Sequence, residues 1–228
     1  MMGFDLIGTF KKGGFAMWPL LVGAVLALMF IIERLIVLFL QKRKLRPDKF
    51  LEEFEASMKK NNGDKDKVVE EMIGVCKKGG VCAEIMMEGL RKFKHVKKMK
   101  MSVLEMKQWL NNAIEERSRI ELPQLEAHIV VISVVAVVSP LMGLFGTVSG
   151  MIRSFTVMAS AAGGAKPNEL AGGISEALIT TATGLVIAIP VLISYNWIKS
   201  MVDNYVMLIE EAAIHLVDSL IIDGNAEA

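Results

Sequence analysis

The residues that could do chemistry in the two most apolar C-terminal stretches of this 228-residue chain are four threonines and one glutamate. They are Thr147, Thr180, Thr181, Thr183 and Glu176. A threonine hydroxyl donates and accepts hydrogen bonds but does not titrate near neutral pH, whereas a carboxylate does. An ionisable group beside or inside an apolar stretch is costly, and it commonly marks an ion or proton pathway.

Small residues surround these threonines at helical spacing. The two rows are Ala136, Pro140, Gly143, Thr147 and Gly150, then Ala177, Thr181, Gly184 and Ala188. A helix face without bulk lets another helix approach closely, and it also leaves room for a further group. We therefore expect Thr147 and Thr181 to line a pore or an inter-helix gap. Thr180 and Thr183 favour helix packing, and Pro140, Gly143 and Gly184 are secondary candidates for either role.

The position of Glu176 supports two hypotheses. A carboxylate near the N-terminal end of a helix interacts favourably with the helix dipole, so Glu176 could cap the third span. Alternatively, it is a proton or cation station at a membrane mouth. The spacing alone does not choose between them.

Three apolar stretches are long enough to cross a bilayer, which requires about 20 residues. The sequence therefore predicts an all-α integral membrane protein with three transmembrane helices, of which helices 2 and 3 extend into the cytoplasm. Short amphipathic cytoplasmic helices are expected between helices 1 and 2. The predicted segments are a periplasmic N-terminus (1–17), helix 1 (18–40), a cytoplasmic region (41–128), helix 2 (129–152), a periplasmic connection (153–176), helix 3 (177–198) and a cytoplasmic C-terminal helix (199–228).

Charge sets the predicted orientation. Lys and Arg gather after the first span, beginning with Lys42, Arg43 and Lys44, which places that side in the cytoplasm. Glu33 and Arg34 lie inside the first span. Because they are adjacent rather than three or four apart, they are not expected to pair simply within the helix, and Glu33 is expected to bond a neighbouring helix or reach the interface.

The composition argues against other classes of protein. A net charge of +1 offers no global basic surface for nucleic acid, and the basic run from Lys92 to Lys100 is typical of a solvated cytoplasmic face. The three histidines and two cysteines match no metal-binding spacing. We expect no catalytic residues, no metal and no cofactor, and hence no enzyme.

Two long motifs closely resemble the TolQ/ExbB/MotA proton-channel family. Residues 139–152 read SPLMGLFGTVSGMI, similar to the family's APLLGLLGTVxGMI, and residues 173–190 read GISEALITTATGLVIAIP, similar to GIxEALxxTAxGLxxAIP. The adjacent Glu33 and Arg34 resemble the "ER" that ends the family's first helix. The glutamate at position 176 favours the ExbB branch. Ser139 and Met142 depart from the pattern only slightly.

The resemblance implies a homo-oligomeric ring, typically a pentamer, around a dimer of a single-span ExbD/TolR-like partner whose membrane aspartate carries the proton. It implies that Thr147 and Thr181 line the channel beside that aspartate and that Glu176 is the ExbB-like acid. The expected function is a stator or channel subunit of an inner-membrane proton-driven motor, energising outer-membrane transport through a TonB-like envelope protein. The alternative is a non-conducting membrane scaffold that anchors an envelope complex.

Overall fold

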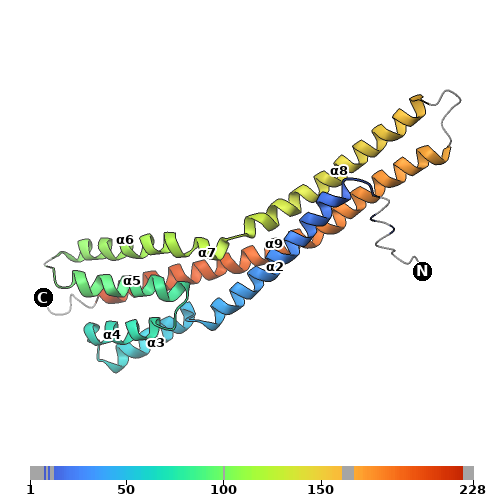
Figure 1. Cartoon of the computed structure of the whole chain (residues 1–228). Coiled ribbons are helices and arrows are strands. Elements are labelled where there is room, and N and C mark those ends of the chain that lie inside the picture. The colour runs from blue at the N-terminus through green and yellow to red at the C-terminus, as the bar shows by residue number, and fades with distance from the viewer. Residues whose placement is uncertain (1–7, 9, 11–12, 100, 161–166, 223–228) are drawn as a thin grey trace. The chain divides into compact units, whose positions relative to one another are not determined.

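The structure is a computed structural model that describes residues 8, 10, 13–99, 101–160 and 167–222. In these residues the regular structure is helical throughout, and no strand is present (Figure 1). The helices are α2 (Met17–Arg43), α3 (Pro47–Lys60), α4 (Lys65–Cys76), α5 (Val81–Val96), α6 (Val103–Glu121), α7 (Pro123–Glu126), α8 (Ile129–Ser160) and α9 (Pro167–Ile222).

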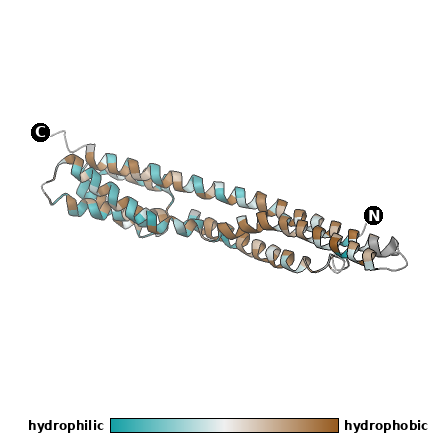
Figure 2. Ribbon diagram, turned by 90° about the horizontal axis from the view of Figure 1, so that it is seen from above, coloured by the Kyte–Doolittle hydropathy of each residue, from teal (hydrophilic) through white to brown (hydrophobic). Residues whose placement is uncertain are grey.

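Three of these helices are long and apolar enough to cross a membrane, which confirms the predicted all-α fold with three spans. The apolar spans are Met17–Gln41, Ile129–Ser160 and Ala171–Ile221. Figure 2 shows mainly hydrophobic residues in α2, in α8 and in the N-terminal part of α9, while the short helices and the C-terminal part of α9 alternate between hydrophobic and hydrophilic residues. At about 1.5 Å per residue, the 56 residues of α9 far exceed the ~30 Å hydrocarbon core.

The predicted segment boundaries remain predictions, because the structure contains no bilayer. Parts of the predicted N-terminal segment and of the connection at 153–176 lie outside the described residues. Within the described part, α8 continues to Ser160 and α9 begins at Pro167, so helix extends beyond both predicted spans.

The chain divides into two compact units. The first contains the described residues of 1–34 and 128–198, and the second those of 35–127 and 199–228. The first unit is a membrane-type unit whose surface is apolar: Val130, Val186 and Ile193 are each more than 60% exposed. Such exposure suits a lipid environment, where apolar side chains face acyl chains instead of water.

The second unit has a conventional buried core formed by α3–α6 and the C-terminal part of α9. Its fully buried large side chains include Phe50, Phe54, Met72, Ile85, Met86, Leu90 and Leu110. Local signals fix the helix ends: the Asp64 carboxylate accepts hydrogen bonds from backbone amides at the start of α4, and Ser102 and Glu105 form a capping box on α6. The capping box explains why α6 begins at Val103.

The helical path is interrupted between α6 and α8. Pro123 begins the four-residue helix α7, at a position in the first helical turn where proline is well tolerated. His128 has a φ of 60°, a left-handed conformation that ends the helical path just before α8.

Candidate functional site

The site is built on the contact between α8 and α9, which meet through residues with little or no side chain. Gly143, Gly146 and Gly150 lie on one face of α8, at positions three or four apart, and all three are buried. A Cβ added at Gly143 would lie 3.0 Å from the Cα of Thr181, and one added at Gly184 would lie 2.6 Å from the carbonyl oxygen of Ser139. The two backbones therefore touch, as small-residue faces allow in membranes.

Thr181 lies in this contact and bonds across it. Its Oγ1 donates a hydrogen bond of 2.8 Å to the carbonyl oxygen of Gly143 on α8. The hydroxyl of Thr147 donates a 2.7 Å bond to the carbonyl of Leu144 within its own helix. Both threonines are half-buried, so each keeps one side accessible at the flank of the helix pair.

Gly143 also connects these two threonines. In an α-helix its carbonyl oxygen is the acceptor position for the amide of the residue four positions on, which is Thr147. Gly143 thus lies next to the backbone of Thr147 and the side chain of Thr181, while the Thr147 hydroxyl itself bonds to Leu144. Pro140 lies one turn before Gly143 and is half-buried.

The hydrogen bonds of Thr180 are buried, and the hydrogen bond of Thr183 lies within its own helix. Thr180 is 1% exposed, and its Oγ1 lies 2.7 Å from the carbonyl oxygen of Gly13 and 2.8 Å from that of Glu176. Thr183 donates to the carbonyl of Ile179, one turn earlier in α9. Threonine side chains commonly bond to their own helix in this way, and a packing role for both residues remains a prediction.

Glu176 pairs with a basic residue on the other helix. Its Oε2 lies 3.1 Å from Nη1 of Arg153, and its side chain is 23% exposed. The carboxylate also lies against Gly14, whose φ of +69° and lack of a Cβ leave it room. A cavity of about 170 Å³ adjoins the pair, lined by Gly13, Phe15, Ala16, Phe145, Gly146, Ser149, Gly150, Arg153 and Glu176.

The helix geometry argues against the capping hypothesis for Glu176. Because α9 begins at Pro167, Glu176 lies nine residues into the helix, and the dipole effect fades within the first turn. Its carboxylate therefore interacts with Arg153 rather than with free backbone amides.

A second charged cluster in the first unit joins α2 to the start of α8. Glu33 forms an ion pair with Arg34, with Oε1 2.6 Å from Nη2, and also contacts Nδ1 of His128 at 3.0 Å. The expectation that Glu33 and Arg34 do not pair is wrong, because neighbouring side chains on one helix can still fold toward each other. His128 was not predicted as a partner, since 95 residues separate it from Glu33.

Between these two clusters the spans carry no charge. The sequence contains no Asp, Glu, Lys, Arg or His from Ile129 to Ile152 or from Ala177 to Ile198. Hydroxyls are therefore the main polar side chains along this stretch of α8 and α9, and hydroxyls do not titrate near neutral pH. Within the described residues no group of three potential metal ligands occurs.

These features define a polytopic helical membrane protein with a close-packed, hydroxyl-bearing helix pair. A profile of the MotA/TolQ/ExbB proton channel family matches residues 78–211, which include both motifs of that pair. The chain belongs to this family. With its three apolar helices, it is a multi-pass protein of the inner membrane.

Individual relatives agree with the family match. The chain is 39% identical over 100 residues to "Putative biopolymer transport protein ExbB-like 3" of Synechocystis sp., covering 43% of this chain and 48% of the relative. It is 34% identical over 116 residues to "Biopolymer transport protein exbB1" of Vibrio cholerae, covering 46% and 51%. It is 46% identical over 76 residues to "Tol-Pal system protein TolQ" of Haemophilus influenzae, covering 33% of each.

The matched part of the chain spans about half the length of these relatives or less. ExbB-like names are the most frequent among the matches, in agreement with the branch that Glu176 favoured.

Proposed function

We propose that this protein is the stator or channel subunit of an ExbB-like, proton-driven motor in the inner membrane. It converts the proton-motive force into mechanical work together with an ExbD/TolR-like single-span partner. The observation that carries this proposal is the uncharged, hydroxyl-bearing α8–α9 pair, because it can surround a proton carrier but cannot itself carry a proton.

The hydrogen bonds of Thr147 and Thr181 indicate which protonation state of a partner's carboxyl group the two hydroxyls would favour. Each hydroxyl has one donor, and each donor is already engaged with a backbone carbonyl. What remains on each oxygen is acceptor capacity. A protonated carboxylic acid could donate into it, whereas a carboxylate could not gain a donor from it. These two threonines would thus favour the neutral form of a partner's acid.

In the proposed assembly, a homo-oligomer, expected to be a pentamer, surrounds a dimer of the partner. The flank bearing Thr147 and Thr181 faces the partner helices, and Glu176 is the acid at the periplasmic mouth. The N-terminus is periplasmic and the C-terminus cytoplasmic. Each charge that crosses the membrane potential releases about 2.3 kcal/mol per 100 mV, so a few protons can drive one conformational step.

The process that the motor energises is proposed from the names of the relatives. The names of the relatives refer to biopolymer transport and to the Tol-Pal system. We propose that the motor energises outer-membrane transport through a TonB-like envelope protein. A short, single-span protein with a membrane aspartate and a periplasmic domain, encoded beside this chain, would identify the partner to use in tests.

The experiment is proton uptake into vesicles that contain this protein and its single-span partner. Thr147→Val and Thr181→Val should each lower the uptake about tenfold, because a lost hydrogen bond of about 1.4 kcal/mol corresponds to that factor. Thr183→Val is the matched control, since it removes a hydroxyl bonded only within α9. Full uptake by both the Thr147 and Thr181 variants would refute the proposed lining.

The competing function is a scaffold that does not conduct. The engagement of every one of these hydroxyls with a backbone carbonyl favours it, since a purely structural threonine bonds in the same way. A scaffold predicts that the envelope function persists after the proton gradient is collapsed with an uncoupler, whereas a motor stops.

A further inference from the structure

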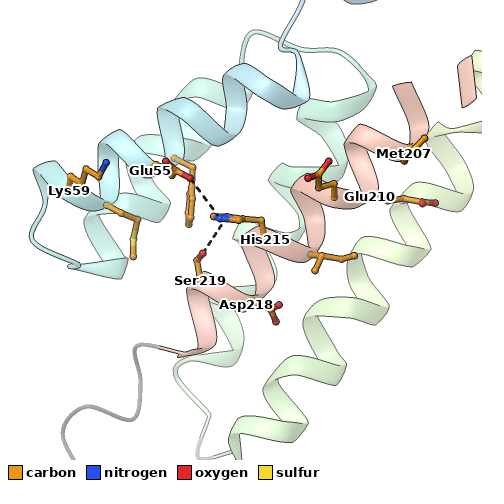
Figure 3. A pocket seen from close by; sticks show the side chains of 11 residues that line it. Glu55, Lys59, Met207, Glu210, His215, Asp218 and Ser219 are labelled. Carbon is orange, nitrogen blue, oxygen red and sulfur yellow. Dashed lines mark hydrogen bonds and ion pairs between the residues drawn. The ribbon is translucent and has the colours of Figure 1, made fainter. Parts of the chain in front are cut away.

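A groove in the second unit has no part in the function proposed above. It runs between α3 and the C-terminal part of α9 and has a volume of about 890 Å³ (Figure 3). Its apolar lining consists of Phe54, Met58, Met207 and Ile214. Met207 and Ile214 are 59% and 63% exposed, although this unit has a well-buried core elsewhere. Apolar side chains left this open in a water-facing unit indicate a contact surface.

The rim of the groove is acidic. Carboxylates of Glu55, Glu210 and Glu211 surround the apolar lining, together with that of Asp218, which is paired with Lys107 of α6. Lys59 and His215 are the basic residues among the lining side chains. Figure 3 shows His215 between Glu55 and Ser219. Residues 200–222 contain four acidic residues and no Lys or Arg. A suitable occupant therefore combines apolar atoms with cationic groups.

The outer face of α5 has that complementary chemistry. Residues 91–100 contain six Lys or Arg and no acid. Lys94 and Lys97 are paired with carboxylates of α4, whereas Arg91 and Lys98 have no ion-pair partner among the described residues. Arg91 and His95 are exposed and four residues apart, which places them on one side of α5, and Lys98 is exposed in the turn that follows this helix.

An aromatic residue lies next to this basic face. Trp109 of α6 is 47% exposed, and the ammonium group of Lys92 lies 4.6 Å from the centre of its ring. Trp and Arg are enriched at protein–protein contacts and dominate their binding energy. We call Arg91, Lys92, His95, Lys98 and Trp109 the basic face.

The groove and the basic face lie on opposite sides of the second unit. Gly89 of α5 faces both α6 and α9, because a Cβ added there would lie 2.9 Å from Cδ1 of Ile114 and 3.6 Å from Cδ2 of Leu216. Ile214 precedes Leu216 by two residues, and Arg91 follows Gly89 by two. Two residues turn an α-helix by about 200°. The groove thus opens on the side of α9 away from α5, and Arg91 points away from α9.

We propose that the groove of one protein copy binds the basic face of a second copy. Because the two surfaces are different and opposed, the contact is heterologous, and such contacts repeat from copy to copy until they close into a ring. The inference gives the homo-oligomer of the proposed function a defined contact surface. Its test measures subunit contact instead of proton transport, so either proposal can fail without the other.

The first test is cross-linking of the full-length protein in membranes with a short bismaleimide. Ile214→Cys combined with His95→Cys should give a ladder of dimers and larger multimers, while each single variant gives none. The matched control combines Ile214→Cys with Lys77→Cys and should give no ladder, because Lys77 is exposed between α4 and the start of α5, whereas His95 lies at the other end of this 16-residue helix. A double variant that remains monomeric on the gel, or a single variant that forms dimers, overturns the proposal.

The second test uses charge reversal. Glu211→Lys and Arg91→Glu should each lower the cross-linking yield about tenfold, because each places like charges opposite one another. Combining the two should restore the yield. Equal yields in all three variants, or a product with the mass of a different protein, would show that another occupant fills the groove. Equal amounts of each variant in the membrane confirm that folding is intact.

Discussion

The Thr181 hydroxyl and the Gly143 carbonyl are joined by a 2.8 Å hydrogen bond from α9 to α8. This bond occurs where the two backbones are in contact, and the acceptor position for the amide of Thr147 is the same carbonyl. A residue proposed to serve the proton carrier thus also holds the helix pair together. Stability and proton transport must therefore be measured separately.

Removing the Thr181 hydroxyl should lower stability only slightly. We expect Thr181→Val to reduce the free energy of unfolding by about 0.6–1.7 kcal/mol, the range of hydrogen bonds between membrane helices. Thr181→Ser keeps the donor and should remain near the unsubstituted value. Unfolding in mixed micelles titrated with a denaturing detergent measures both. A loss in the Ser variant alone, with the Val variant unchanged, would mean that the methyl group, not the hydroxyl, matters.

Adding one carbon at the helix contact should be costly. Gly184→Ala places a Cβ 2.6 Å from a backbone carbonyl, so α8 and α9 must separate, and we expect a loss of about 1–3 kcal/mol. Gly172→Ala is the matched control, because nothing lies within 4 Å of its added carbon. The same unfolding titration should show Gly172→Ala unchanged or slightly stabilised, since alanine favours helix more than glycine. A similar loss in both would contradict the close contact.

The Glu176–Arg153 pair separates a structural from a functional role for Glu176. The side chain of Arg153 is 65% exposed, and exposed ion pairs contribute about 0–1 kcal/mol, so neither Glu176→Gln nor Arg153→Gln should unfold the protein. If Glu176 is a proton station, Glu176→Gln alone should stop proton uptake into vesicles. Loss of uptake in Arg153→Gln to the same extent would instead indicate that the ion pair is what matters.

The two cysteines should be inert in the folded protein. Burial raises the pKa of both thiols to about 12, with neighbouring carboxylates adding to the effect at Cys76. Thiols with a raised pKa stay protonated at neutral pH, and the thiolate is the reactive form. Maleimide labelling should therefore be slow until the protein is unfolded in detergent. Rapid labelling of the native protein would show that the second unit opens readily.

Glu71 gives a pH dependence to the α3–α4 contact. Hydrogen bonds from Lys60, Ser57 and Asn61 lower the pKa of Glu71 from its ordinary 4.5 to about 2. A lowered pKa stabilises the fold above the unfolded value, and that contribution is lost as the pH falls from 4.5 toward 2. Glu71→Gln should thus flatten the decline in thermal midpoint over this range. An unchanged slope would contradict the role of these hydrogen bonds.

The sequence was sufficient for the features that depend on local pattern. Apolar length predicted the three spans, and the two motifs predicted the family. Contacts between distant residues were beyond it. Nothing near Glu33 points to His128, and nothing near Thr180 points to Gly13, because both contacts arise only when separate helices assemble. The sequence predicted Glu176 at a helix end because the apolar stretch begins at residue 177, whereas the helix itself begins at Pro167.

The glycine-lined contact also constrains how such a machine could move. With backbone against backbone at Gly143 and Gly184, and only short side chains such as those of Ala177 and Thr180 in the contact, α8 and α9 have little between them that could slide or change rotamer. The pair should therefore move as one rigid body. Any movement driven by protons must then take place at the outer surfaces of the helix pair, where it contacts other copies and the partner.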